Sequence, residues 1–207
     1  MSITLQDLGR RYNREWIFRH VDYTFSTGKK YAILGPNGSG KSTFLKVVAG
    51  SLSPSEGQVL YRASESIHVA VEDVFSDVSI AAPYLELIEE FTLREMIAFH
   101  FKFKPFLAGY DTNRIIQLLK LDHAVDKEIR FFSSGMKQRV KLALACCSDT
   151  KLLLLDEPTS NLDVAGEQWY LDLVAETSHN HRIVLVGSNQ EREYVFCEES
   201  LNMLTYK

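Results

Sequence analysis

The sequence predicts an α/β fold with a mostly parallel core sheet, an antiparallel β layer at the N-terminus and an inserted helical subdomain. Three observations support this fold class. Several N-terminal segments alternate apolar and polar residues, as the half-buried strands of an antiparallel layer do. Two denser apolar runs, residues 31–34 and 152–155, each end at a loop that carries chemically active residues, which is typical of buried parallel strands. A helix-rich stretch lies between these two runs.

Each expected element has its own pattern. Alternation predicts strands at residues 3–8, 21–25 and 59–61, and dense apolar runs predict buried strands at residues 31–34, 152–155 and 183–186. Helices are expected at residues 40–49, 93–101, 112–119, 134–147 and 164–177. The polar stretch 62–77 reads as a loop with short strands. We therefore expect one domain, in which residues 1–84 and 150–207 form the core and residues 85–149 form the helical subdomain.

Composition excludes several function classes. With 207 residues, of which 45% are hydrophobic, the chain can bury one sizeable core. The net charge of −4 gives no electrostatic reason to expect a nucleic-acid partner, because a polyanion is usually met by a basic face. The three cysteines form no CxxC pair, which favours structural thiols in a reduced compartment. No apolar run approaches the roughly 20 residues that span a bilayer, and no signal peptide is evident, so a cytoplasmic chain is expected.

A phosphate-binding loop follows the first dense apolar run. The segment GPNGSGKS at residues 35–42 matches the pattern GxxxxGK[ST] between a predicted strand and a predicted helix. Glycines let the backbone wrap a phosphate so that successive N–H groups point inward, and the helix N-terminus adds partial positive charge. Lys41 is expected to reach the β- and γ-phosphates of ATP, and Ser42 to ligate Mg²⁺. The residues expected at the phosphates are Gly35, Asn37, Gly38, Ser39, Gly40, Lys41, Ser42 and Thr43.

A second acidic site follows the other dense run. The segment LLLLDEP at residues 152–158 places two carboxylates at the end of a buried strand, where parallel sheets bind ligands. Asp156 is expected to hold Mg²⁺, and Glu157 to polarise the attacking water as general base. In a structural interpretation, Asp156 instead caps the next turn and Glu157 is merely solvated. The phosphate-binding loop favours the catalytic interpretation.

Two further segments narrow the assignment. The run FSSGMKQRV at residues 132–140 resembles the ABC signature, usually written LSGGQ and followed by a Gln-Arg pair. The run SNLD at residues 160–163 looks like the D-loop of the same family. With Walker A and Walker B motifs in family order over most of the chain, the sequence resembles the ATP-binding domain of ABC transporters.

The resemblance implies a mechanism. Two such domains pair head to tail, as a homodimer or with a paralogous ATPase subunit, and each ATP lies between one P-loop and the partner's signature helix. A helix that begins near Ser134 offers unpaired N–H groups to a γ-phosphate. The residues implied at this interface are Ser133, Ser134, Gly135, Met136 and Asp163. Tyr12 matches the A-loop aromatic that stacks on adenine, with Trp16 and Phe18 as alternative stacking residues.

The sequence departs from the family at three positions. No glutamine lies between Gln58 and Gln117, so the Q-loop glutamine is missing, and Tyr84 or Glu86 is the substitute. The switch histidine is replaced by Ser188, which we expect to be catalytic, with Asn189 or Gln190 as further hydrogen-bonding groups. Met136 replaces the signature glutamine. These losses affect the expected turnover rate: either hydrolysis is slow, or the substitutes support normal hydrolysis. His179 and His181 are expected on a solvated loop.

The leading hypothesis is an ATPase subunit that energises a separate integral membrane transporter subunit at the inner face of the cell membrane. Its partner is expected to dock near residues 80–91, unless those residues belong to the core. One alternative is a soluble ABC ATPase without a transport role, although such relatives usually carry coiled coils or basic extensions. The other is a nucleotide-gated binding module with little turnover.

Overall fold

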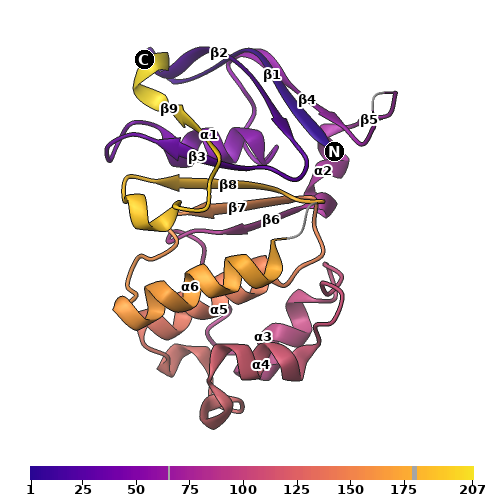
Figure 1. Cartoon of the computed structure of the whole chain (residues 1–207), viewed down its shortest axis with the longest axis vertical. Helices are drawn as coiled ribbons and strands as arrows, with labels where there is room; N and C mark the ends of the chain where they lie inside the picture. Colours follow the sequence, from indigo (N-terminus) through magenta and orange to yellow (C-terminus); the bar gives the residue numbers. More distant parts are fainter. Residues whose placement is uncertain (65, 179–180) are drawn as a thin grey trace.

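The computed structural model describes residues 1–64, 66–178 and 181–207, which form two sheets and a set of helices (Figure 1). The antiparallel sheet has the order β2-β1-β4-β5. Its strands are β1 (Ser2–Tyr12), β2 (Glu15–Ser26), β4 (Glu56–Arg62) and β5 (His68–Val69). The second sheet has the order β6-β7-β8-β3-β9, and all its pairs are parallel. Its strands are β6 (Val78–Ala81), β7 (Leu152–Asp156), β8 (Ile183–Ser188), β3 (Lys30–Leu34) and β9 (Glu199–Asn202).

The helices cover the parallel sheet from both sides. They are α1 (Lys41–Val48), α2 (Val71–Val74), α3 (Leu93–His100), α4 (Thr112–Leu119), α5 (Ser134–Cys146) and α6 (Val164–Thr177). In Figure 1, α1 lies between the two sheets, and α3 to α6 lie on the other side of the parallel sheet. This layering explains the dense apolar runs, because strands covered on both faces need apolar residues at every position.

Strand β7 shows how one run of leucines serves two cores. Leu152 and Leu154 pack into the cluster formed with the antiparallel sheet and α1, whereas Leu153 and Leu155 pack into the cluster formed with α3 to α6. All four are fully buried. The alternation follows from the two-residue period of a strand. Strand β7 therefore joins the two clusters.

Polar side chains cap the beginnings of α3, α4, α5 and α6. Thr92 and Glu95 form a capping box at α3, and Asp111 caps α4. Ser133 caps α5 and Asp163 caps α6, each by accepting from a backbone N–H three residues on. The last two caps belong to the signature and D-loop segments, so local helix chemistry fixes the shape of both motifs.

The predicted fold class is confirmed. Each expected strand and helix is present, with ends shifted by a few residues, and α4 and α6 have the expected bounds. Strands β6 and β9 were not expected, because each is only four residues long and lies at an edge of the parallel sheet. The division into a core and a helical subdomain stays a prediction. Among the described residues, no helix is both long enough and apolar enough to span a bilayer.

Arg182 connects α5 to the start of β8 from a buried position. It is 4% exposed, and its guanidinium donates to the carbonyls of Cys146 at 2.9 Å and Thr150 at 2.8 Å, and to that of Ser148. Burial lowers its pKa from the usual value. The last carbonyls of a helix have no partner within the helix, so this fork of donors satisfies the Cys146 carbonyl at the end of α5 and adds a charged donor to the carbonyls of Ser148 and Thr150.

Replacing Arg182 with Met should lower the free energy of unfolding by about 3 kcal/mol, because three buried carbonyls lose a charged donor. Urea denaturation measures the change. Arg94→Met is the control, since Arg94 is half exposed and only 3.9 Å from Asp126; it should cost less than about 0.5 kcal/mol. Equal losses in the two variants would show that the carbonyl contacts contribute nothing specific.

Candidate nucleotide site

Three parallel strands bring the predicted phosphate, metal and switch segments to one edge of the sheet. Leu34 pairs with Ser188, and Asp156 pairs with Gly187, so β3, β7 and β8 end level with one another. The loops that follow these strands therefore emerge side by side. This edge is where open α/β sheets bind ligands.

The P-loop needs glycine at two positions for geometric reasons. Gly35 has φ +145° and Gly40 has φ +102°, values that L side chains rarely adopt. A Cβ at Gly40 would also lie 2.6 Å from Cγ2 of Ile17, so β2 packs closely against the start of α1. Gly40 is the N-cap of α1, and within the described part of the chain no side chain caps this helix. The first N–H groups of α1 therefore remain available to an anion.

Lys41 lies beneath the loop that it follows. It is 5% exposed, and its Nζ donates to the carbonyls of Gly35 at 2.8 Å and Pro36 at 3.3 Å. Ser42 and Thr43 are partly exposed in the first turn of α1. An ammonium has three N–H donors, and two carbonyls accept from this one, so Lys41 can still donate a hydrogen bond to a phosphate.

Asp156 is a buried acidic group at the centre of the site. It is 1% exposed, and neither carboxylate oxygen has a hydrogen-bond partner of good geometry among the described residues. Burial raises the pKa of Asp156, while the nearby Ser42 hydroxyl and Lys41 ammonium act in the opposite direction. A buried carboxylate without a partner is costly. Oxygen ligands of this kind are those that Mg²⁺ prefers, so the residues fit a bound magnesium ion.

Tyr84, one of the two substitutes that the sequence left open for the Q-loop glutamine, lies beside Asp156. Burial raises the pKa of the Tyr84 hydroxyl, and the adjacent Asp156 carboxylate adds to the effect. The Lys46 ammonium lies 3.9 Å from the centre of the Tyr84 ring, which ties the tyrosine to α1. Glu86 instead lines a groove beside β6 and α3. Tyr84 is thus the substitute that reaches the acidic site.

Glu157 is held by its backbone in an unusual conformation. Its φ is +43°, which is uncommon for a residue with a side chain. Its N–H donates to the Gly187 carbonyl at 2.8 Å, and Ser160 donates back to the Glu157 carbonyl at 3.1 Å. The side chain is half-buried beside Asp156. Strain of this kind persists only where the surroundings fix it.

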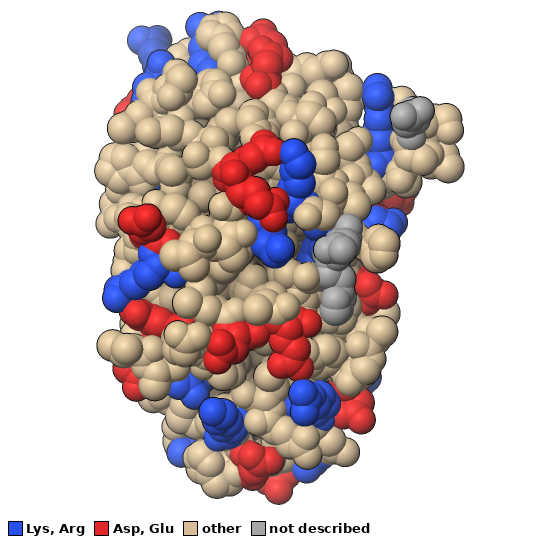
Figure 2. Space-filling model, in the orientation of Figure 1, with Lys and Arg blue, Asp and Glu red and all other residues tan. Residues whose placement is uncertain are grey.

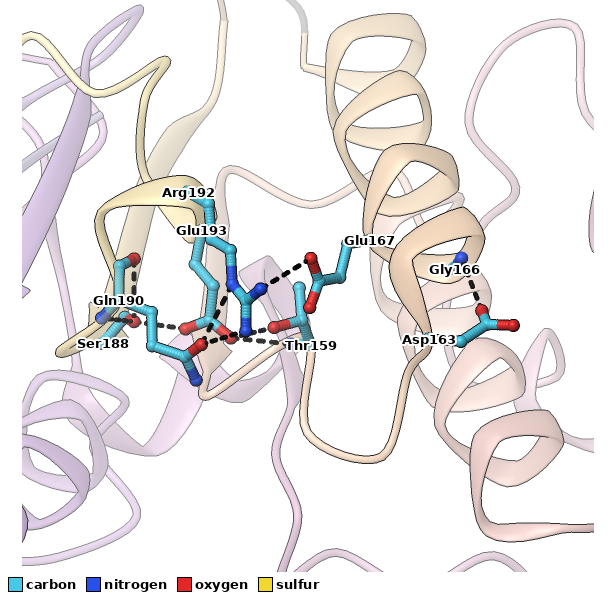
Figure 3. Close-up of polar contacts among 8 residues, drawn as sticks. All are labelled: Thr159, Asp163, Gly166, Glu167, Ser188, Gln190, Arg192 and Glu193. Atoms are coloured by element: carbon cyan, nitrogen blue, oxygen red, sulfur yellow. Dashed lines mark hydrogen bonds and ion pairs between the residues drawn. The ribbon is translucent and has the colours of Figure 1, made fainter.

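Ser188 lies differently from the sequence expectation. It is fully buried, and its hydroxyl donates to Glu193 while accepting from the N–H of Gln190 at 2.9 Å (Figure 3). A hydroxyl has one proton to donate, so Ser188 has none left for a phosphate, and the geometry does not support a catalytic role. The next residue, Asn189, is exposed, and its amide donates to Asn37 of the P-loop at 3.3 Å. Of the expected histidines, His181 is exposed, and His179 lies outside the described residues.

The signature segment and the D-loop face each other within the chain. Ser133 and Ser134 are exposed, and a Cβ on Gly135 would lie 3.0 Å from the Asn161 carbonyl. A cavity of about 330 Å³ lies between the segments. Its lining comprises Leu121, Ser133, Ser134, Gly135, Met136, Arg139, Asn161, Leu162 and Asp163. No hydrogen bond or ion pair among the described residues joins this signature segment to the P-loop of the same chain.

Two side chains near this cavity tie it to neighbouring elements. Asp163 accepts from the Gly166 N–H at 2.8 Å as the cap of α6. Gln138 was not singled out from the sequence, yet it is buried and donates to the Pro158 carbonyl at 2.8 Å. Its position in a Gln-Arg pair gave the only sequence signal. It links α5 to the loop after β7.

The three aromatic candidates for adenine stacking differ in accessibility. Phe18 is fully buried against Phe44, so it presents no free face. Trp16 is flanked by the guanidinium groups of Arg11 and Arg19, 5.4 and 4.4 Å from its ring. Tyr12 is 46% exposed, and only Arg10 lies over its ring. Tyr12 is therefore the most available of the three.

Comparison with known proteins agrees with this geometry. A sequence model of the ABC transporter family matches residues 18–160. The chain belongs to the ABC transporter family. Within that family it is the ATP-binding subunit, which hydrolyses ATP to energise transport, as the motifs predicted.

The lantibiotic transport ATP-binding protein SrtF of Streptococcus pyogenes is 28% identical over 192 residues, covering 90% of this ABC chain and 80% of SrtF. A putative ABC transporter ATP-binding protein from Pyrococcus furiosus superposes with a TM-score of 0.83 at 21% identity, over 100% of both chains. The dimeric ATP-binding cassette MJ0796 bound to ADP and Pi superposes with a TM-score of 0.81 at 21% identity, covering 97% of this chain and 93% of that one. These two structural likenesses establish the fold.

Replacing Asp156 with Asn should stabilise the protein in the absence of nucleotide, by about 1 kcal/mol, because the amide removes a buried unpaired charge. The same change should abolish the extra stabilisation by MgATP over ATP alone. Thermal unfolding with and without MgATP measures both effects. Asp149→Asn, at an exposed position, is the matched control and should change neither. A loss of stability without nucleotide would mean that Asp156 has a protein partner.

Replacing Tyr12 with Ala should raise the ATP dissociation constant about tenfold, since stacking of a base on an aromatic ring contributes about 1–3 kcal/mol. Trp16→Ala should change it less than about twofold, because guanidinium groups already cover that ring. Titration with a fluorescent ATP analogue gives both values. The reverse order of effects would assign the base to Trp16.

Proposed function

We propose that this subunit binds MgATP at the edge formed by β3, β7 and β8, pairs head to tail with a second ABC ATPase domain, and drives a separate integral membrane subunit. The observation that carries the proposal is the buried Asp156 carboxylate, whose oxygens have no hydrogen-bond partner of good geometry among the described residues and which lies beside Ser42 and Lys41. Such an arrangement is explained by a bound cation and phosphate rather than by folding.

Each residue of the site then has a role. Lys41 and the N–H groups at the start of α1 bind the phosphates, and Ser42 and Asp156 hold Mg²⁺. When bound, the ion neutralises charge on the phosphate oxygens. Glu157 takes a proton from the attacking water as general base. Tyr84 takes the place of the family's Q-loop glutamine, and Asn189, which follows Ser188 at the histidine position, supplies a further neutral hydrogen-bonding group beside the P-loop.

The head-to-tail dimer is supported by the position of the signature segment. Its exposed serines border a cavity with the D-loop, whereas the P-loop of the same chain makes no bond to them among the described residues. A second copy, or a paralogous ATPase subunit, would place its nucleotide against this helix start. The MJ0796 cassette, which shares the fold, is itself a dimer.

The membrane partner is proposed to dock in the groove beside β6. A cavity of about 280 Å³ there is lined by Ile80, Leu85, Leu87 and Met96, among others, with Lys104 and Lys141 at its edge. Leu87 and Ile88 also pack against the helical core. In this proposal the segment therefore contributes both to the core and to the docking surface. The relative SrtF is a transport ATP-binding protein. A cytoplasmic position at the inner face of the membrane follows from this docking.

A second candidate function is a nucleotide-gated module with little turnover. The observation that favours it is the Ser188 hydroxyl, which is bonded to Glu193 and leaves no donor for a phosphate at that position. It predicts ATP binding and dimer formation without release of phosphate.

Replacing Glu157 with Gln should lower the ATPase kcat at least about a hundredfold, as expected for loss of a general base, while ATP binding persists and ATP-dependent dimers accumulate. Lys41→Ala should lose ATP binding itself. Phosphate release, nucleotide titration and size-exclusion chromatography measure these three properties, alone and with the membrane partner. Glu72→Gln, at an exposed position outside the proposed docking segment, is the matched control. ATP binding without turnover in every form, wild type included, would favour the nucleotide-gated module.

A further inference from the structure

Among the described residues, one buried carboxylate is not used by the proposed mechanism. Glu193 lies in the short 3-10 turn Glu191–Glu193 after β8 and is fully buried. One of its oxygens accepts from the N–H of Thr159 at 3.0 Å and from the Thr159 hydroxyl. The other accepts from the Ser188 hydroxyl. Three donors thus converge on a single side chain (Figure 3), and bonds to a charged acceptor are the strong ones.

Together with one backbone bond, these contacts close a ring that includes the backbone of the general base, Glu157. Thr159 lies two residues after Glu157, and Ser188 lies one residue after Gly187. The Glu157 N–H already donates to the Gly187 carbonyl at 2.8 Å. Glu193 makes the second connection between the same two loops, from Ser188 on one side to Thr159 on the other. The loops after β7 and β8 are therefore joined at two points: one is the Glu157 N–H itself, and the other lies two residues further along, at Thr159.

The turn that carries Glu193 is itself fixed to α6. The Tyr170 hydroxyl donates to the Glu193 carbonyl at 2.8 Å, from a fully buried ring. On the outer side, the Arg192 guanidinium forms an ion pair with Glu167 at 3.0 Å and donates to the Gln190 side chain (Figure 3). Glu193 is thus held by its backbone as well as by its donors, so it can act as a rigid anchor.

An anchor at this place has a specific purpose. The Glu157 backbone has φ +43°, a strained value that requires support from both sides. We propose that Glu193 is a positioning residue for Glu157: it holds the loop after β7 against the loop after β8 so that the Glu157 carboxylate stays directed at the attacking water. This inference rests on the proposed role of Glu157 as general base. The same ring turns Ser188 inward and leaves Asn189 to face the P-loop.

Replacing Glu193 with Gln tests the proposal with little change of shape. An amide retains one acceptor oxygen but faces the second set of donors with N–H groups, so the ring opens on one side. The ATPase kcat should fall about tenfold, while the ATP dissociation constant stays within about twofold, because the P-loop is untouched. Glu191→Gln, in the same turn but exposed, is the matched control and should change neither value.

Hydrogen exchange supplies a measurement that does not depend on turnover. In the nucleotide-free protein, the amides of residues 156–163 should exchange about tenfold faster in Glu193→Gln than in wild type, as expected when a charged acceptor is lost. Glu191→Gln should match wild type. If Glu193→Gln fails to fold, a second pair of variants tests the same contact from the other side: Thr159→Val removes the hydroxyl donor, and Thr159→Ser is its control. Thr159→Ser, which keeps both donors, should retain kcat, and Thr159→Val should lower it severalfold.

The outcomes separate this proposal from the proposed function. A lower kcat with unchanged ATP binding and faster exchange supports a positioning role. Faster exchange with an unchanged kcat would reduce Glu193 to a structural anchor and overturn the proposal, as would no change in either property. Absence of turnover in the wild type contradicts the proposed function instead. If the wild type shows no turnover but Glu193→Gln exchanges faster, Glu193 is an anchor of the loop without a role in hydrolysis. If exchange in Glu193→Gln is also unchanged, both the proposed function and the role of Glu193 are overturned.

Discussion

The parallel register of β3, β7 and β8 brings the Asp156 carboxylate into the protein interior, between two hydrophobic clusters and beneath the P-loop. Its two oxygens are buried without a hydrogen-bond partner of good geometry in the described part of the chain, and that burial raises its pKa. The protein therefore carries an electrostatic cost at the edge where its loops converge. Lys41, Ser42 and Tyr84 reduce that cost only in part. In the proposed function, nucleotide with its metal ion removes the rest, so the site is both a binding site and a source of instability without ligand.

The other half of the site is built on a different principle. At α5 and α6, Ser133 and Asp163 cap helices, and each cap uses a backbone N–H three residues on. Fixed helix starts place exposed serines and backbone N–H groups next to the D-loop, with little buried charge. The P-loop side of the site thus contains a buried carboxylate that needs a ligand. On the signature side, by contrast, the polar groups are capped or exposed to solvent. Gln138 connects the two, because its amide holds the Pro158 carbonyl between Glu157 and the D-loop.

Most of the fold could be predicted because each element has a pattern visible within its own segment. The leucines of β7, for example, have to be apolar at every position, since both faces of the strand are covered. Strands β6 and β9 escaped prediction because four residues at a sheet edge carry too short a pattern. At the site, the motif residues were visible as spacing, but the orientation of Ser188 was not. Its position in the sequence matched the switch residue, while its direction depends on Glu193, five residues later, and on Thr159, which comes from another loop.

The same distinction explains how the site differs from family expectation without losing its architecture. Instead of the family's glutamine and histidine, the site has Tyr84 beside Asp156 and has Ser188 and Asn189 at the end of β8, and none of these side chains gains charge near neutral pH. A neutral switch group cannot respond to phosphate by taking up a proton, so positioning has to come from fixed contacts. Glu193 supplies such contacts: it ties the loop that carries the general base to the end of β8, and its turn is fixed to α6 through Tyr170 and Arg192. In this chain, therefore, geometry held by a buried carboxylate takes the place of a residue that changes its charge.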